Sequence, residues 1–248
     1  MSNLKTHIED IKAKLDSILL NTQLIIDGDH SKLIQDGLRV SYKALDSSGS
    51  TLVDTGPAKS NGSLSGSYTK NGSNIAFSGG YGLTGNINSV QGTFEIVCSV
   101  NSNFTPYNSS AWYSQSSVFG REINGLVQDW AIVLQANTGY YQFGYGGTSA
   151  DMVKTTNIKA NTGLVHYLAV TKSGNRADFY IDGELKATAT DVKSSDTIPD
   201  KYGIMWSDAN SSSITQGAFY MFQYYNRSLS VDEIRNNYKY YKSHCGIK

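Results

Sequence analysis

The sequence is poor in cysteine and proline and carries no net charge. Its 248 residues include two cysteines and three prolines, and 21 basic side chains balance 21 acidic ones. A disulfide framework is therefore excluded, and so is the basic field that holds a nucleic-acid backbone. No apolar run approaches the roughly 18 residues of a membrane-spanning helix. We accordingly expect no nucleic acid and no membrane insertion.

The first residues also lack the apolar segment of a secretory signal peptide. Charged side chains interrupt them at Lys5, Glu9, Asp10, Lys12 and Lys14. We therefore expect the protein to be made and released in a cytoplasm. Cys98 alternates with Phe94 and Ile96 in a strand-like run, which favours a small buried thiol over a disulfide with Cys245.

Glycine and tyrosine are abundant, with 24 and 17 copies, and they suit many short strands joined by polar turns. Apolar alternation predicts strands at 37–45, 74–84 (two short segments), 92–100, 118–122, 129–135, 140–144, 164–171, 176–181, 184–190 and 201–206. Ser47–Thr69 has too little apolar content for the core, so we interpret it as surface loops. Asn101–Ser117 is a long polar stretch with several aromatic residues, and loops of this length are often functional.

The segment Gly217–Tyr238 predicts a final strand followed by a helix. Its first half is apolar and aromatic, as expected for a strand with a buried face. Ser230 and Glu233 have the spacing of a capping box, so a helix should run from Val231 to Tyr240.

The run YNRSLSVDEI in this segment resembles the closing strand and short terminal helix of the concanavalin A-like lectin/glucanase superfamily, in its laminin G-like branch. Three further runs, NIAFSGGYGLT, GTFEIVCSV and HYLAVTKSGNRADFYIDG, are similar to other strands of that family. The resemblance covers about residues 37–240 and implies an antiparallel β-sandwich of jelly-roll type. Residues 241–248 would then be a C-terminal tail.

The N-terminal residues 1–26 lie outside this resemblance and carry a heptad pattern. Residues with spacings of three and four form a single stripe, which predicts a coiled coil, and 27–36 would be a linker. The predicted oligomerisation residues are Leu4, Ile8, Ile11, Leu15, Ile18 and Ile25. Isoleucine in this seam disfavours a parallel dimer, so we predict a homotrimer. The alternative is a helix packed on its own globular head.

The distribution of carboxylates and histidines along the chain favours a protein that is not an enzyme. Glycosidases of the resembled fold use paired carboxylates, whereas the strand that holds Glu95 offers only one. His166 is the one histidine within the head, and packing explains it better than catalysis. We expect no cofactor, although the resemblance allows one calcium ion, and Asp182 fits a turn better than a metal site. The candidate calcium ligands are Asp208, Asn210, Asp129 and Asp151.

Saccharide binding is the remaining chemistry, because saccharide sites combine exposed aromatic rings with a few placed polar groups. Two stretches have this composition, Phe104–Gln115 and Trp206–Gln216. The candidate glycan-binding residues are Tyr107, Trp112, Tyr113, Trp206, Asp208 and Asn210. We expect Trp112 and Tyr113 to be exposed and Trp130 to lie in the core. For Trp206, the pattern fits an exposed position and a core position equally well.

A helical stem without a signal sequence, joined to a lectin-like head, is similar in architecture to a bacteriophage fibre or receptor-binding protein. This hypothesis places the protein in a virion. The stem would dock to another virion protein, and the trimeric heads would bind host cell-surface polysaccharide. The alternative is a purely structural head-fibre or decoration protein without glycan binding. A glycan hydrolase is the third hypothesis, which the missing carboxylate pair disfavours.

Overall fold

The computed structural model of the chain describes residues 32–87, 89–109, 111–121, 129–146, 151–192, 201–206 and 214–248. The chain divides into two units, Met1–Leu33 and Ile34–Lys248. The predicted coiled coil and the first half of the predicted linker lie outside the described residues. The helix, its seam and the trimer therefore stay predictions.

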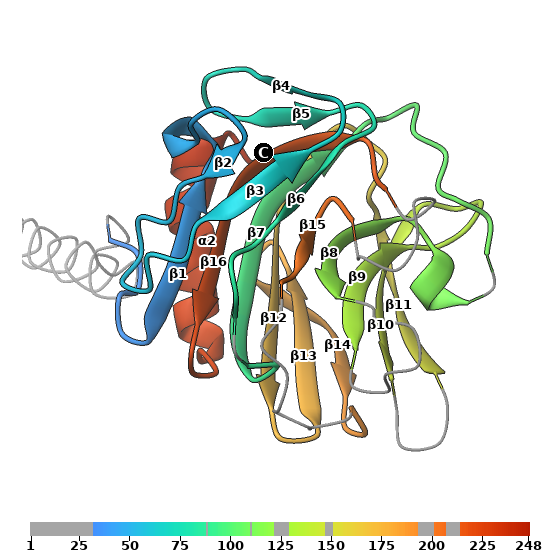
Figure 1. The fold of residues 1–248 in the computed structure, drawn as a ribbon. Helices are drawn as coiled ribbons and strands as arrows, with labels where there is room; N and C mark the ends of the chain where they lie inside the picture. Colours follow the sequence, from blue (N-terminus) through green and yellow to red (C-terminus); the bar gives the residue numbers. More distant parts are fainter. Residues whose placement is uncertain are drawn as a thin grey trace, which may run out of the picture. The chain divides into compact units, whose positions relative to one another are not determined.

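Residues from Leu38 onward form two antiparallel sheets (Figure 1), as the sequence predicts. The first, here called sheet A, has the order β14 (Glu184–Ala189), β13 (Arg176–Ile181), β12 (Val165–Ser173), β7 (Gly92–Val100), β16 (Gly217–Tyr225), β5 (Ile75–Phe77), β4 (Tyr68–Lys70), and β1 (Leu38–Lys43) also pairs with β16. The second, sheet B, has the order β11 (Asp151–Lys159), β10 (Tyr140–Gly146), β9 (Trp130–Leu134), β8 (Ser117–Arg121), β15 (Gly203–Ile204), β6 (Tyr81–Leu83), β3 (Gly62–Ser65) and β2 (Thr51–Leu52).

The core lies between the two sheets and is rich in aromatic rings. Phe94 of β7 packs edge-on against Trp130 of β9, with ring centroids 5.0 Å apart. Both side chains are at most 2% exposed, so the prediction of a core Trp130 is confirmed. Cys98 is a free, buried thiol on the same face of β7, which confirms that prediction too. Alternate residues of β7 and β13 point into this core, namely Phe94, Ile96, Cys98, Val100, Ala177, Phe179 and Ile181.

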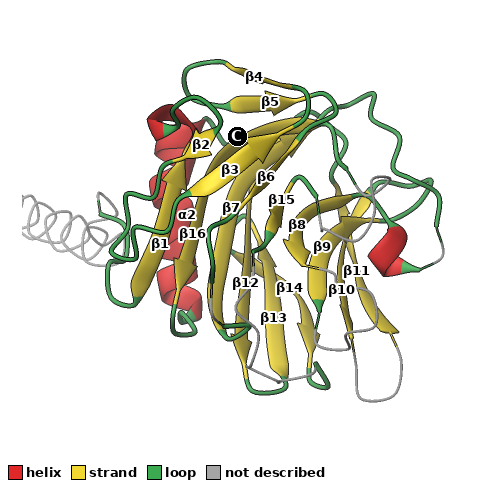
Figure 2. Cartoon of the chain, viewed as in Figure 1, coloured by secondary structure: helices red, strands yellow, loops and turns green. Residues whose placement is uncertain are grey.

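The helix α2 (Val231–Cys245) covers the outer face of sheet A beside β12 and β16 (Figure 2). It begins with the predicted capping box, in which the Glu233 amide donates to Ser230 and the Ser230 amide donates to the Glu233 carboxylate at 2.8 Å. The helix continues past the predicted end at Tyr240, because Tyr241 is buried and stacks on Tyr167 of sheet A. Residues 241–248 are therefore largely helix, and Ile247 is 5% exposed.

The prediction of surface loops over Ser47–Thr69 is wrong. This segment contains β2, β3 and part of β4, and Leu52 and Leu64 point into the core. β2 and β3 are short, and serine or threonine precedes or follows the leucine in each. Leu52 and Leu64 are thus the only apolar residues in these two strands, too few to show a period. A further strand, β11, was not predicted because its residues are largely polar.

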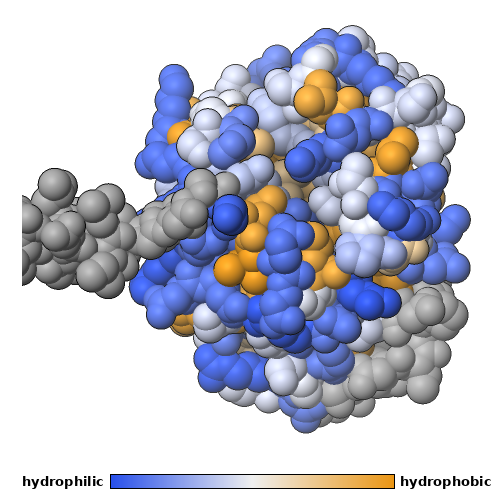
Figure 3. All heavy atoms as spheres, turned by 90° about the vertical axis from the view of Figure 1, so that its left-hand side faces the viewer, coloured by the Kyte–Doolittle hydropathy of each residue, from blue (hydrophilic) through white to orange (hydrophobic). Residues whose placement is uncertain are grey.

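The surface over α2 and β1 is mixed in character (Figure 3). Hydrophilic side chains separate small apolar areas on this face. Among the large hydrophobic side chains that are exposed in the described residues, Leu45 and Val231 belong to this side of sheet A. Small separated areas of this kind are ordinary for a protein surface and do not indicate a docking face.

Candidate functional site

Trp112 anchors the long polar loop to the outer face of sheet B. The residue begins the short helix η2 (Trp112–Ser114), which lies against β10 and β11. Its ring packs on Ala131 and Val133, and it covers Gly144 so closely that a Cβ there would come 2.5 Å from a ring atom. Trp112 is 3% exposed. The expectation of an exposed contact residue is therefore wrong, because the side-chain-free Gly144 opens a seat for the indole.

The anchor holds two tyrosines on the surface of the same loop. Tyr113 lies edge-on to Trp112, with centroids 6.0 Å apart, and it is 38% exposed. Tyr107 is 49% exposed, and its amide donates to the Ser116 hydroxyl at 2.9 Å. Asn161 also donates to the Phe104 carbonyl at 3.0 Å. The loop thus presents two exposed rings from a hydrogen-bonded frame.

Trp206 forms a second aromatic surface, with a partner that the sequence did not indicate. It stacks on Tyr81 of β6 with centroids 4.1 Å apart and planes 33° from parallel, and both residues are half-buried. Tyr81 pairs with the exposed Ser65 on the outer face of sheet B. The sequence signal for Tyr81 was its position in the run GGYGLT, which is similar to a strand region of the family.

Backbone strain sets the direction of Trp206. The preceding residue, Met205, has a φ of 59° and is fully buried, an unusual combination for a bulky side chain. The Met205 amide donates to the Val118 carbonyl at 2.7 Å, and its own carbonyl accepts from Thr215. The left-handed residue breaks the alternation of β15, so that Trp206 turns out of the core and onto Tyr81.

The two aromatic surfaces occupy different parts of sheet B. Trp112 lies over β9 and β10, whereas Trp206 follows β15 and stacks on β6, and β8 runs between β9 and β15. The structure therefore brings Trp112 and Tyr113 together and places Trp206 apart from them. Asp208 and Asn210 lie outside the described residues.

Glu95, the single carboxylate of its strand, is buried on the opposite sheet beneath α2. Its Oε1 accepts from the Tyr167 hydroxyl at 2.6 Å and from the Asn237 amide at 2.9 Å. Burial raises the pKa of this carboxyl from 4.5 to about 7, and the two hydrogen bonds oppose that rise. The side chain is 0% exposed, so it has no access to a saccharide on sheet B.

His166 is held by a turn residue rather than by a reaction partner. Its Nδ1 lies 2.7 Å from Asp182 Oδ2, and the other carboxylate oxygen of Asp182 accepts from the Tyr167 amide at 3.0 Å. Asp182 has a φ of 53° and precedes Gly183 in a tight hairpin turn. The pair fixes that turn, in agreement with the packing role expected for His166.

The candidate calcium ligands are only partly described. Asp129 is 2% exposed and lies 3.7 Å from the Arg121 Nε, which neutralises its charge in part. In the described ranges, no three His, Cys, Asp or Glu side chains gather as a metal ion would require. Nor does any helix there have the length and apolar content to cross a membrane. A calcium site stays a prediction.

Several solved structures share this fold. A Trypanosoma rangeli sialidase in complex with 2,3-difluorosialic acid superposes with a TM-score of 0.61 at 16% identity, covering 91% of this chain and 39% of the sialidase. Domain 4 of AbnA, an extracellular arabinanase from Geobacillus stearothermophilus in complex with arabinotriose, gives 0.61 at 14% identity over 82% of this chain and 98% of that domain. The binding domain of Botulinum neurotoxin DC, in complex with rat synaptotagmin II, gives 0.58 at 13% identity over 83% of this chain and 52% of that one.

Sequence comparison identifies the family directly. No curated protein sequence matches the chain. The family model of the concanavalin A-like lectin/glucanases superfamily matches residues 91–235, which include β7, the loop of Trp112 and the capping box of α2. That match spans more than half of the chain and agrees with the jelly-roll sandwich. The chain therefore belongs to the concanavalin A-like lectin/glucanase superfamily.

Proposed function

We propose that the protein is a non-enzymatic, lectin-like glycan-binding protein whose saccharide contacts come from sheet B. The observation that carries this proposal is the stack of Trp206 on Tyr81, which a strained Met205 turns toward the surface. Left-handed backbone at a bulky residue costs about 1–3 kcal/mol and is concentrated at functional sites. Met205 itself packs in the core, whereas the ring that it directs outward, Trp206, is only half-buried.

The chemistry of saccharides matches these aromatic surfaces. Sugar rings present apolar CH faces that stack on indole and phenol rings, and their hydroxyl rims need amide and hydroxyl partners. Tyr107 and Tyr113 supply further exposed rings in a loop rich in asparagine and serine. Trp112 acts in this proposal as their anchor and makes no direct contact with the ligand.

The proposal contains no catalytic step. Glu95, a buried carboxylate in the described part of the sandwich, accepts hydrogen bonds from Tyr167 and Asn237, which hold it in the structure. Hydrolysis of a glycoside with a carboxylate pair requires both acids to reach one glycosidic bond. The strand of Glu95 offers no second acid. Binding without turnover is thus the activity that these residues support.

We further propose that the N-terminal residues 1–26 join the heads into a homotrimer on a bacteriophage virion. The support is the heptad pattern in the sequence, together with the lectin-like head. Each aromatic surface is shallow, and a weak site gains strength when several copies bind one cell surface at once. The stem would dock to another virion protein and the heads would bind host polysaccharide.

A structural virion protein is the second candidate, and one observation favours it. Trp112, the largest aromatic residue of the long loop, is buried at 3% exposure, so the loop offers less stacking surface than its composition indicates. A jelly roll of that kind would bind other virion proteins only. The two candidates differ in whether the folded protein holds any glycan.

The test is binding of the tagged full-length protein to a panel of bacterial glycans and whole cells. A Tyr107→Ala/Tyr113→Ala variant and a Trp206→Ala variant probe the two surfaces. Tyr240→Ala on α2, a half-buried tyrosine over sheet A, is the matched control. We expect selective binding that both test variants weaken and the control keeps. Binding to nothing by a folded protein would favour the structural candidate, and release of sugar from a polysaccharide would contradict the non-enzymatic proposal.

A further inference from the structure

A hollow of about 420 Å³ lies at the end of sheet A where three neighbouring strands meet. It forms where β7 begins, between the turn that follows β12 and the segment that follows β16. Gly92 is its floor, with a φ of 112° and so little room that a Cβ would come 2.1 Å from the Tyr225 carbonyl oxygen. The close approach of β7 to β16 at this point therefore requires glycine at the first position of β7.

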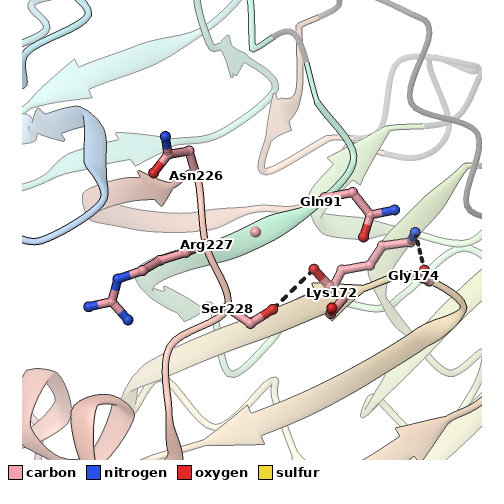
Figure 4. Close-up of a pocket in the computed structure, with 8 residues that line it drawn as sticks. Gln91, Lys172, Gly174, Asn226, Arg227 and Ser228 are labelled. Atoms are coloured by element: carbon pink, nitrogen blue, oxygen red, sulfur yellow. Dashed lines mark hydrogen bonds between the residues drawn. The ribbon is translucent and has the colours of Figure 1, made fainter.

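Two hydrogen bonds connect the walls of this hollow (Figure 4). Ser228 donates to the Lys172 carbonyl at 3.2 Å, and the Lys172 ammonium donates to the Gly174 carbonyl at 3.1 Å. The Arg227 guanidinium points away from the hollow and pairs with both oxygens of Glu233. The walls are thus joined to each other and to the start of α2.

Gln91 leaves a hydrogen-bond acceptor unused at the edge of the hollow. Its backbone carbonyl accepts from the Tyr224 hydroxyl at 3.1 Å, which fixes the residue. Its side-chain Oε1 is buried, and no atom of the described residues donates to it. A buried acceptor without a donor costs free energy, so a turn of the Gln91 side chain that brought Oε1 to a hydroxyl group of a bound molecule would remove that cost.

Two more hollows adjoin the first and extend it across the end of the sheet. One, of about 380 Å³, shares Asn226 with it and is bounded by Arg39, Asn86 and Tyr224. The other, of about 300 Å³, shares Ser173 and Ser228 with it. The three hollows share these lining residues and so lie side by side at this end of sheet A; together they are here called the end groove.

The lining of the end groove indicates its ligand. Amide, hydroxyl and charged side chains line it, beside apolar residues such as Leu229 and Val231. The lining residues with amide or aliphatic hydroxyl groups are Asn86, Ser89, Gln91, Thr171, Ser173, Asn226, Ser228 and Ser230, and the charged ones are Arg39, Lys172, Arg176, Asp178 and Arg227. Side chains that donate and accept hydrogen bonds along neighbouring hollows can pair with the hydroxyl rims of a chain of sugar rings.

We propose that the end groove is a second saccharide-binding site, which takes an extended segment of a polysaccharide chain. It is separate from the aromatic surfaces of the proposed function. β7 begins in the end groove and ends at the long polar loop, and its nine residues span roughly 30 Å. Two sites this far apart on one head would let a single head cross-link or grip a long polysaccharide at two points.

The experiment tests the end groove in the full-length protein with a glycan array that contains bacterial polysaccharides and defined oligosaccharides. Ser173→Trp fills two of the hollows from an exposed turn position, and Asn226→Ala removes the amide that joins the first two. Asn175→Trp is the matched control, because it lies in the same turn, is exposed and lines none of the three hollows. Hydrogen–deuterium exchange with a bound glycan locates the protected segments.

We expect Ser173→Trp and Asn226→Ala to weaken at least one bound glycan by about tenfold or more, the effect of one lost polar contact. The Asn175→Trp control and the Tyr107→Ala/Tyr113→Ala variant should bind that glycan with unchanged affinity. Hydrogen–deuterium exchange in the wild type should slow at residues 89–92, 172–175 and 224–228 when the glycan is bound. Some glycans could bind every end-groove variant as strongly as the wild type and lose affinity only in the aromatic variants. That result would contradict the second site at the end groove and leave the proposed function standing. The reverse pattern would keep the end groove and overturn the aromatic surfaces. A folded protein that binds no glycan would overturn both.

Discussion

Replacing Glu95 by glutamine should change how the stability of the head depends on pH. Glu95 is fully buried between sheet A and α2, where Tyr167 and Asn237 both donate to its Oε1. A glutamine keeps that accepting oxygen and has nearly the same shape, but it cannot ionise. Its amide nitrogen replaces Oε2, which has no donor or acceptor partner among the described residues. The fixed cost of burying that nitrogen is the same at every pH.

The expected magnitude follows from the pKa of the carboxyl, which burial raises from 4.5 to about 7. The folded protein holds the proton more tightly than the unfolded chain does. The contribution of Glu95 to stability is therefore fully present below about pH 4.5 and is lost as the pH rises through 7. A difference of about 2.5 pH units corresponds to roughly 3 kcal/mol of unfolding free energy.

The assay is urea unfolding, followed by tryptophan fluorescence, at about pH 5 and about pH 8.5. Both proteins are measured at one concentration, with Glu184→Gln, an exposed carboxylate, as the control. Relative to the wild type, Glu95→Gln should gain roughly 2–3 kcal/mol between the lower and the higher pH. A difference between variant and wild type that stays constant with pH would refute the buried, proton-retaining Glu95.

Three further predictions concern the loop anchor, the helix cap and the stem. Trp112→Ala should destabilise the head by about 3–5 kcal/mol in denaturant unfolding, because it empties the seat over Gly144, and a loss under 1 kcal/mol would contradict the buried anchor. Ser230→Ala should cost about 1 kcal/mol in thermal unfolding by removing the capping acceptor of α2, and an unchanged midpoint would show that the cap does not limit stability. Leu15→Asp should dissociate the oligomer in light scattering if the seam is assigned correctly, and an intact trimer would show that it is not.

The sandwich was predictable where alternation and local signals agree. β7 and β13 begin and end at their predicted residues, because strict alternation of apolar side chains marks one buried face. The start of α2 was also predictable, since the capping box is a local pattern of Ser230 and Glu233. Its end was not, because Tyr241 is held by contact with Tyr167, a residue far away in sequence.

The short strands of Ser47–Thr69 were beyond sequence analysis for a related reason. β2 and β3 each bury one leucine, and their other side chains are small and polar. Two residues do not make a detectable period. β2 pairs with β3, and β3 pairs with β6; this pairing makes them strands, and it is a property of the assembled sheet.

The candidate site was predicted in composition but only partly in geometry. The sequence identified Trp112, Tyr113 and Trp206 as aromatic residues in polar surroundings, yet it placed Trp112 at the surface. Whether an indole in a loop is exposed depends on a seat elsewhere in the chain, and here Gly144 of β10 provides it. The stack of Tyr81 on Trp206 depends likewise on the neighbouring positions of β6 and β15 in sheet B.

The most direct test of a glycan-binding head is the affinity of the full-length protein for intact bacterial cells, compared with the same protein carrying Tyr107→Ala, Tyr113→Ala and Trp206→Ala. We predict saturable binding to particular strains that competes with their purified surface polysaccharide and falls by at least about tenfold in the triple variant. Binding that survives all three substitutions and ignores the free polysaccharide would contradict it.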